Sequence, residues 1–172
     1  MADVINLRIK AELEILPNGI EVSLETEIAE TKEKTVVFCS RLDKQKGIDK
    51  FIELASAFRE EGIIFEIYGP DGGELSFVLN EIESRNLKES LFYRGSLQSI
   101  EVQEMLKKVH LLVLPSEKDA FPMIVLEALS VGTPVLVMPS CGISTPLFKY
   151  EPRFVAPTED IAGLGKILQC HI

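Results

Sequence analysis

The sequence predicts an α/β protein with a Rossmann-like, doubly wound parallel sheet, and two observations lead to this prediction. From residue 35 onward, short apolar runs rich in β-branched and aromatic residues alternate with longer segments of helical period. The runs are apolar almost without interruption, which fits strands that are buried on both faces of a parallel sheet. A length of 172 residues is enough for one such domain with a single hydrophobic core.

Six apolar runs are predicted strands, of which the last is the weakest. In chain order they are "TVVFCS" (35–40), "IIFEIYG" (63–69), "LFYRG" (91–95), "LLVLPS" (111–116), "PVLVMP" (134–139) and "FVAP" (154–157).

The segments between the first four runs predict amphipathic helices. Gly62 is the expected stop of the first helix, and Ser99 is the expected N-cap of the third. Their predicted buried positions are Ile48, Phe51, Ile52, Ala55 and Phe58 in the first helix, Leu75, Val78, Leu79 and Ile82 in the second, and Ile100, Met105, Leu106 and Val109 in the third.

Composition limits the classes of function. With 46% hydrophobic and 26% charged residues, the chain reads as a globular protein, and no apolar run approaches the roughly 20 residues of a membrane-spanning helix. The beginning of the chain shows no signal-peptide pattern, and three cysteines without metal-ligand spacing favour a reducing compartment and no metal site. These features predict a cytoplasmic protein. A net charge of −9 argues against general nucleic-acid binding.

The stretch "EKDAFPMIVLEALSVGTPV" (117–135) predicts a ligand site at the start of a helix. Ligands of doubly wound sheets bind outside the carboxyl ends of the strands, and this stretch follows the fourth predicted strand. Pro122 suits the first position of a helix, so the amides of Phe121, Met123 and Ile124 are free to meet a phosphate.

Glu127 lies within the apolar part of this helix, where an unpaired carboxylate is unfavourable. Two interpretations are open: it pairs with an arginine in the core, or it binds the two hydroxyls of a ribose. The stretch "SRLDKQKGID" (40–49) favours the second. Arg41 and Lys46 flank a loop at the same edge of the sheet, where they can meet a diphosphate, although a solvated charged turn would explain this stretch alone.

Three stretches, taken together and in order, resemble a known family. "SRLDKQKGIDKFIEL", "LFYRGSL" and "LPSEKDAFPMIVLEALSVGTPVLV" are similar to the carboxy-terminal, donor-binding domain of the group 1, family 4-like, retaining glycosyltransferases of the GT-B fold, and "ILPNGIE" (15–21) resembles the segment that leads into that domain. The resemblance implies that residues 1–34 are a leading segment and polar loop, and that residues 35–172 are a Rossmann-like nucleotide-sugar-binding domain.

The resemblance also assigns roles to residues. It implies that Arg41 and Lys46 bind and stabilise the departing diphosphate, that Glu127 binds the donor ribose, and that Asp119 orients the transferred sugar, so that Asp119, Arg41 and Lys46 are the catalytic residues. The remaining donor-binding positions are Ala120, Phe121, Pro122 and Met123 beside the sugar and phosphates, and the backbone of Arg94, Gly95, Ser96 and Leu97 beside the base.

Two departures from the family pattern stand out. The first acid of the paired-acid motif is usually glutamate, and Asp119 is one methylene shorter; the pair Ala120-Phe121 narrows the expected sugar pocket. There is no Asp-x-Asp motif, so the diphosphate is expected to be neutralised by cations and helix amides, with no metal ion and no cofactor besides the donor, a nucleoside diphosphate sugar of the UDP or GDP type.

The implied activity is transfer of a hexose, with retention of configuration, to a glycan or lipid-linked acceptor, as in polysaccharide or lipopolysaccharide biosynthesis. The family's enzymes have two halves, and this chain resembles the donor half, so it is expected to be a fragment or excised domain that is inactive alone. The amino-terminal acceptor domain is its expected partner, and would carry any peripheral association with the inner face of the membrane.

Two alternatives remain open. One is half of a nucleotide-sugar 2-epimerase, which is expected to need further carboxylates and a histidine near the sugar; His110 precedes the fourth predicted strand, at the opposite edge of the sheet. The other is a non-catalytic nucleotide-binding or interaction domain. Retention of Arg41, Lys46 and a buried Glu127 speaks against a purely structural role, because without a ligand these charged residues would only destabilise the fold.

Overall fold

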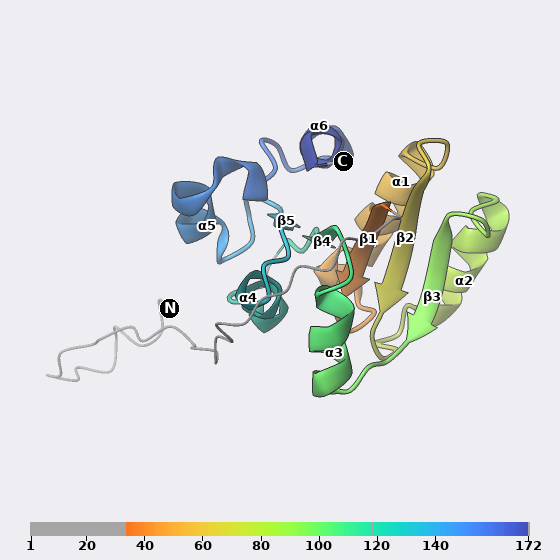
Figure 1. Cartoon of the computed structure of the whole chain (residues 1–172). Helices are drawn as coiled ribbons and strands as arrows, with labels where there is room; N and C mark the ends of the chain where they lie inside the picture. The colour runs from red at the N-terminus through yellow and green to blue at the C-terminus, as the bar shows by residue number, and fades with distance from the viewer. Residues whose placement is uncertain (1–33, 118, 172) are drawn as a thin grey trace, which may run out of the picture.

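The computed structural model describes residues 34–117 and 119–171 and has the predicted alternation of strands and helices (Figure 1). The predicted leading segment therefore lies outside the described residues, except for Lys34, which begins the first strand. The predicted fold class is confirmed: one parallel sheet is flanked by helices.

Five parallel strands form the sheet in the order β3-β2-β1-β4-β5. The sixth predicted run contributes a single bridge, between Val137 and Val155, instead of a strand. The strand bounds are β1 (Lys34–Cys39), β2 (Ile63–Tyr68), β3 (Leu91–Gly95), β4 (Leu111–Leu114) and β5 (Val135–Val137).

The helices cover both faces of the sheet. Helix α1 packs against α2 and α6, whereas α3 packs against α4, and Figure 1 shows the pair α1 and α2 on the side opposite α3 and α4. Right-handed crossovers produce this division when the strand order reverses in the middle of the sheet. The helix bounds are α1 (Ile48–Ala57), α2 (Leu75–Ser84), α3 (Ser99–Leu106), α4 (Met123–Ser130), α5 (Ser144–Tyr150) and α6 (Ile161–His171), with short 3₁₀ turns η2 (Lys44–Lys46) and η3 (Pro152–Phe154).

Some details of the helix predictions are wrong. The first helix ends at Ala57, before its predicted stop at Gly62. The N-cap of α3 is Gln98 and not Ser99, because the Glu101 carboxylate accepts from the Gln98 amide at 2.7 Å. Ile100 and Leu79 were expected to be buried but are 67% and 49% exposed. Short α3 packs through its carboxyl end, and α2 lies at the edge of the sheet, so each buries a narrower face than its sequence pattern suggests.

Aromatic rings from three elements form the centre of the core between α1 and the sheet. Phe38 of β1, Phe51 of α1 and Phe65 of β2 are fully buried. The ring centroids of Phe38 and Phe51 are 5.5 Å apart, and those of Phe51 and Phe65 are 5.8 Å apart. These contacts fix α1 on the sheet and thereby the loop that leads from β1 into it.

The strand order reverses between β1 and β4, and in doubly wound sheets the ligand-binding crevice lies at the carboxyl ends of the two strands that flank such a reversal. They pair through Val36↔Leu111 and Val37↔Leu112, so both strands run on past their paired part before their loops begin. Within residues 34–117 and 119–171, no helix has the length and apolar character needed to cross a membrane.

Candidate functional site: the crevice between β1 and β4

The loop after β1 is a short, internally capped turn. The Asp43 carboxylate accepts from the Gln45 amide at 2.9 Å, which caps η2 and orders the turn that carries Lys46. Gly47 then takes a φ of +77°, and a Cβ there would lie 2.1 Å from the carbonyl oxygen of Pro115. Only glycine lets this loop approach the end of β4 so closely, and the approach brings Lys46 to the loop after β4.

Lys46 and Asp119 form an ion pair across the crevice. The two side chains are only 26% and 13% exposed, so the pair is partly withdrawn from water. The backbone of Asp119 is held from the other side, because its carbonyl accepts from the Gly142 amide at 2.8 Å. A Cβ at Gly142 would lie 1.9 Å from the Ala120 carbonyl oxygen, so the loops after β1, β4 and β5 meet at this point.

Arg41 lies at the same edge as Lys46, as the sequence predicted. It donates to the Asp43 carboxylate at 2.9 Å, and its side chain is 60% exposed. The Gln45 amide, with added attraction from Arg41, holds the pKa of Asp43 below its usual value. Arg41 also lies along Gly72, where a Cβ would come within 2.8 Å of its Cγ. Both predicted diphosphate-binding cations therefore stand at the crevice, each paired with a carboxylate.

Helix α4 begins in the loop that carries Asp119. Pro122 was predicted to be the first helical residue but is the N-cap, so the helix begins one position later, at Met123, and the proline gives no side-chain cap. The amides of Met123 and Ile124 thus belong to the uncapped first turn of the helix. Ala120 is exposed and Phe121 is half-buried, so the first turn remains accessible from the crevice.

Glu127 of α4 lies near the end of β1. Burial, with a further contribution from Glu127, raises the pKa of the Cys39 thiol to about 12, which places the two side chains within electrostatic range of each other. Glu127 is half-buried, and in the described part of the chain it forms no ion pair with an arginine. The core arginine that would have explained this residue structurally is therefore not found there.

The end of β3 divides the predicted base-binding segment between two faces. The Arg94 side chain turns onto the face of the sheet, where Nη2 lies 2.7 Å from the Glu66 carboxylate and the guanidinium lies 4.7 Å from the centre of the Phe92 ring. Gly95 ends the strand with a φ of +84°, and the backbone of residues 95–97 continues at the carboxyl edge. The Arg94 side chain thus points away from the carboxyl edge of the sheet.

Two polar residues outside the crevice, Asp71 and His110, have structural contacts. The Asp71 carboxylate accepts from the amides of Gly73 at 2.7 Å and Leu75 at 3.1 Å, and so shapes the turn into α2. Nδ1 of His110 accepts from the Thr35 amide at 3.2 Å, at the amino-terminal edge of the sheet and away from the crevice.

Sequence reasoning missed two parts of the site. Asp43 was not singled out, although an aspartate two residues before an amide in a short turn is a recognisable capping pattern. Gly142 was not identified as the clamp on Asp119 because nothing local in the sequence indicates that the loops after β4 and β5 touch.

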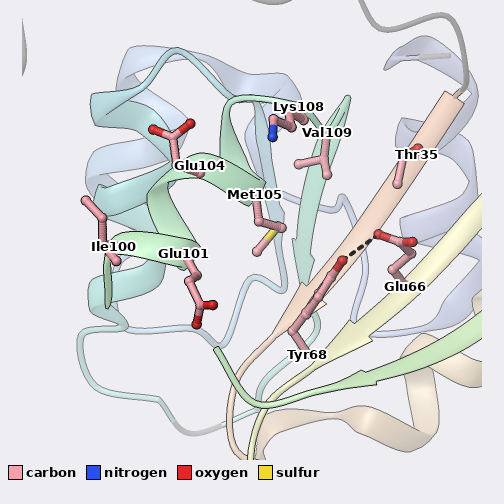
Figure 2. Close-up of a pocket in the computed structure, with 9 residues that line it drawn as sticks. All are labelled: Thr35, Glu66, Tyr68, Ile100, Glu101, Glu104, Met105, Lys108 and Val109. Carbon is pink, nitrogen blue, oxygen red and sulfur yellow. Dashed lines mark hydrogen bonds between the residues drawn. The ribbon is translucent and has the colours of Figure 1, made fainter. Parts of the chain in front are cut away.

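A separate hollow of about 460 Å³ lies on the face of the sheet between α3 and the first two strands (Figure 2). Glu66 and Tyr68 line it from β2, and Glu101, Glu104 and Met105 line it from α3. The Tyr68 hydroxyl donates to Glu66 at 2.9 Å. No residue predicted for the donor site lines this hollow, so we assign the candidate site to the crevice.

No cluster of three or more His, Cys, Asp or Glu side chains suited to a metal ion occurs among residues 34–117 and 119–171. The two buried cysteines at the site, Cys39 and Cys141, are free thiols. Burial raises the pKa of the Cys141 thiol, which lies 3.8 Å from the Ser116 hydroxyl. Both cysteines therefore serve as packing at the ends of β1 and β5.

Comparison with known proteins assigns most of the chain to one family. Residues 21–169 match the sequence model of a family described as glycosyl transferases, group 1. A glycogen synthase from Mycobacterium tuberculosis is 23% identical over 160 residues, which cover 90% of this chain and 38% of that relative. The chain thus spans about two fifths of the length of this relative.

Solved structures show the same fold. The carboxy-terminal domain of LpcC, a group 1 glycosyl transferase family protein from Francisella tularensis, superposes with a TM-score of 0.71 at 16% identity, covering 86% of this chain and 87% of that domain. HepE from Anabaena, solved in complex with UDP and glucose, superposes with a TM-score of 0.67 at 17% identity, covering 80% of this chain and 38% of HepE.

Proposed function

Because the chain belongs to the group 1 glycosyl transferases, we propose that its crevice between β1 and β4 binds a nucleoside diphosphate sugar. The observation that carries this proposal is the convergence of the Arg41 and Lys46 loop, the uncapped start of α4 and the Glu127 carboxylate at one edge of the sheet. Cations and helix amides suit a diphosphate, and a carboxylate that is not paired with an arginine suits the hydroxyls of a ribose.

In the proposed complex, Arg41, Lys46 and the amides at the start of α4 hold the diphosphate. Glu127 accepts from the ribose hydroxyls, and the backbone of residues 95–97 faces the base. Asp119 and the residues up to Pro122 face the sugar. When the glycosidic bond to the diphosphate breaks, negative charge builds up on the leaving oxygen, and preorganised donors at this position lower the barrier.

We propose that the reaction is hexose transfer with retention of configuration to a glycan or lipid-linked acceptor, and that it is completed by an acceptor-binding half. The 38% share of the glycogen synthase that this chain spans supports a larger enzyme. The diphosphate is neutralised by the protein's own cations, without a metal ion. The uridine nucleotide in the HepE complex makes UDP the first donor fragment to test.

Titration of the 172-residue chain with UDP, GDP and ADP tests the proposal, with and without magnesium. One half of a cleft is expected to bind its nucleotide at about millimolar strength, roughly −4 kcal/mol, which NMR chemical shifts can follow. Lys46→Ala and Glu127→Ala should each weaken binding of the preferred nucleotide at least about fivefold, since each loses a charge-assisted hydrogen bond.

Matched controls come from α2 and the turn after it. Lys88 and Glu83 form an exposed ion pair on this part of the chain, so Lys88→Ala and Glu83→Ala remove the same two residue types away from the crevice. These variants should bind the nucleotide as the parent chain does. Equal binding by all four variants would contradict the site assignment, and absence of binding by the parent chain would contradict the function proposed for it.

A further inference from the structure

The ion pair between Lys46 and Asp119 occupies the place where the proposed function needs a free cation. Lys46 has Asp119 as its counter-ion, and both side chains are largely withdrawn from water. Arg41, the second cation, is paired with Asp43 and is mostly exposed. The more buried cation of the crevice is therefore neutralised by a carboxylate from the opposite loop.

The backbone of each partner in this pair is held by contacts with a neighbouring loop. Lys46 sits at the end of η2, which Asp43 caps and Gly47 ties to β4. Asp119 is fixed through its carbonyl to the Gly142 amide. Any change in the pair must come from side-chain rotation, which is the easier motion for a lysine with its flexible four-carbon stem than for the shorter aspartate.

A diphosphate that enters the crevice competes with Asp119 for Lys46. Its oxygens carry more negative charge than one carboxylate, and charges of the same sign repel strongly where water is partly excluded. A carboxylate that stayed on Lys46 would both reduce the charge available to the phosphates and repel them. The pair thus opposes binding of the diphosphate until Lys46 changes partner.

We propose that Asp119 masks Lys46 in the unliganded protein, and that the donor diphosphate takes over Lys46 and so releases the Asp119 carboxylate toward the sugar. This inference rests on the proposed function of the crevice. It makes Asp119 an exchangeable counter-ion as well as a residue beside the sugar, and it links occupation of the phosphate site to availability of the sugar-binding carboxylate.

Titration with UDP, which lacks the transferred sugar, separates masking of Lys46 from binding of that sugar. In Asp119→Asn the isosteric amide removes the charge, so UDP should bind about tenfold more tightly, equivalent to about 1.4 kcal/mol. In a Lys46→Met background, the same Asp119→Asn change should alter the affinity less than about threefold, because the masked cation is absent.

Glu117 provides the matched control. It lies on the same loop and pairs with Lys50 of α1 at 2.6 Å, so Glu117→Gln removes a carboxylate from the same loop and leaves the ion pair between Lys46 and Asp119 in place. Glu117→Gln should change UDP affinity less than about twofold. A tenfold gain there would attribute the effect to net charge and overturn the masking proposal.

The outcomes distinguish this inference from the proposed function. If the parent chain binds UDP and Glu127→Ala weakens it, but Asp119→Asn leaves binding unchanged or weaker, masking is wrong and the function stands. If the parent chain binds no nucleotide, the proposed function fails and the inference fails with it. Circular dichroism and urea unfolding of each variant ensure that a change in affinity is not a change in folding.

Discussion

Gly47 shows how one residue can determine the geometry of the crevice. It combines a φ of +77° with a contact in which a Cβ would lie 2.1 Å from the Pro115 carbonyl oxygen. Any other residue would have to adopt an unfavourable backbone conformation and also push the loop after β1 away from β4. Because Lys46 directly precedes it, that displacement would move a proposed phosphate-binding cation.

We predict that Gly47→Ala lowers the free energy of unfolding by about 2 kcal/mol or more, and that it weakens UDP binding. Urea unfolding and NMR titration measure the two effects. Gly62 is the matched control, since it has a φ of +69° but a Cβ added there would have no atom within 4 Å. Gly62→Ala should lower the free energy of unfolding by about 1 kcal/mol, through backbone strain alone, and should leave the UDP affinity unchanged. Equal destabilisation of the two variants would mean that the contact with Pro115 is unimportant.

Residue identity alone indicated Glu127, Arg41 and Lys46, because charged side chains next to apolar runs are conspicuous in the sequence. It did not indicate the direction of the Arg94 side chain, which depends on the pairing of β2 with β3. That pairing sets Glu66 beside Phe92 and leaves the Arg94 side chain on the same face as Glu66. Side chains alternate between the two faces of a strand, but which neighbours a side chain meets on its face is known only once the partner strand is known.

At the scale of the element, helix ends hold the carboxyl-terminal part of the chain in place. Helix α6 begins beside Asp160, whose carboxylate accepts from the Gly163 amide at 2.8 Å and from the Thr158 hydroxyl at 2.6 Å. These hydrogen bonds hold the pKa of Asp160 below its usual value, and the bond from the Thr158 hydroxyl has the largest effect. The helix packs against α1 and β5, so its first turn contributes to the closure of one face of the sheet.

We predict that Asp160→Ala lowers the midpoint of urea unfolding at neutral pH, because the Gly163 amide at the start of α6 loses its hydrogen-bond acceptor. The pKa of Asp160 is lower in the folded than in the unfolded state. The ionised Asp160 carboxylate therefore stabilises the fold fully above its unfolded pKa of about 4. This stabilisation is lost as the pH falls through the lower pKa of the folded state.

Urea unfolding between about pH 7 and about pH 2 measures this effect. The difference between the parent chain and Asp160→Ala should shrink below about pH 4. Asp160→Asn, which keeps an acceptor without the charge, should retain most of the stability at neutral pH. A difference between parent and Asp160→Ala that stays constant over the whole acidic range would contradict a role for the ionised carboxylate.

Across the whole molecule, one core fixes the relation between the sheet and the helix that follows the β1 loop. Phe51 is fully buried between the rings of Phe38 and Phe65, which come from two neighbouring strands. Truncation of this side chain would leave a cavity that three elements share, and the surrounding backbone can collapse only partly into it.

We predict that Phe51→Ala lowers the free energy of unfolding by about 3 to 5 kcal/mol, as measured with urea. Phe77 on α2 is a suitable control because it is 37% exposed. Phe77→Ala should cost about 1 kcal/mol or less, since much of its transfer free energy is not gained on folding. Similar losses in the two variants would indicate that α1 is not fixed by the aromatic contacts at the centre of the core.

The sequence by itself determined the fold class, the five main strands and the loops that carry charge, because hydrophobic period and residue type are local properties. It also indicated Lys46, Asp119 and Glu127 as candidates. The tertiary structure alone decided that Lys46 pairs with Asp119 and that the Gly142 amide donates to the Asp119 carbonyl. These contacts join loops far apart in the chain, and their geometry depends on strand order and on the packing of the whole sheet, which no local pattern contains.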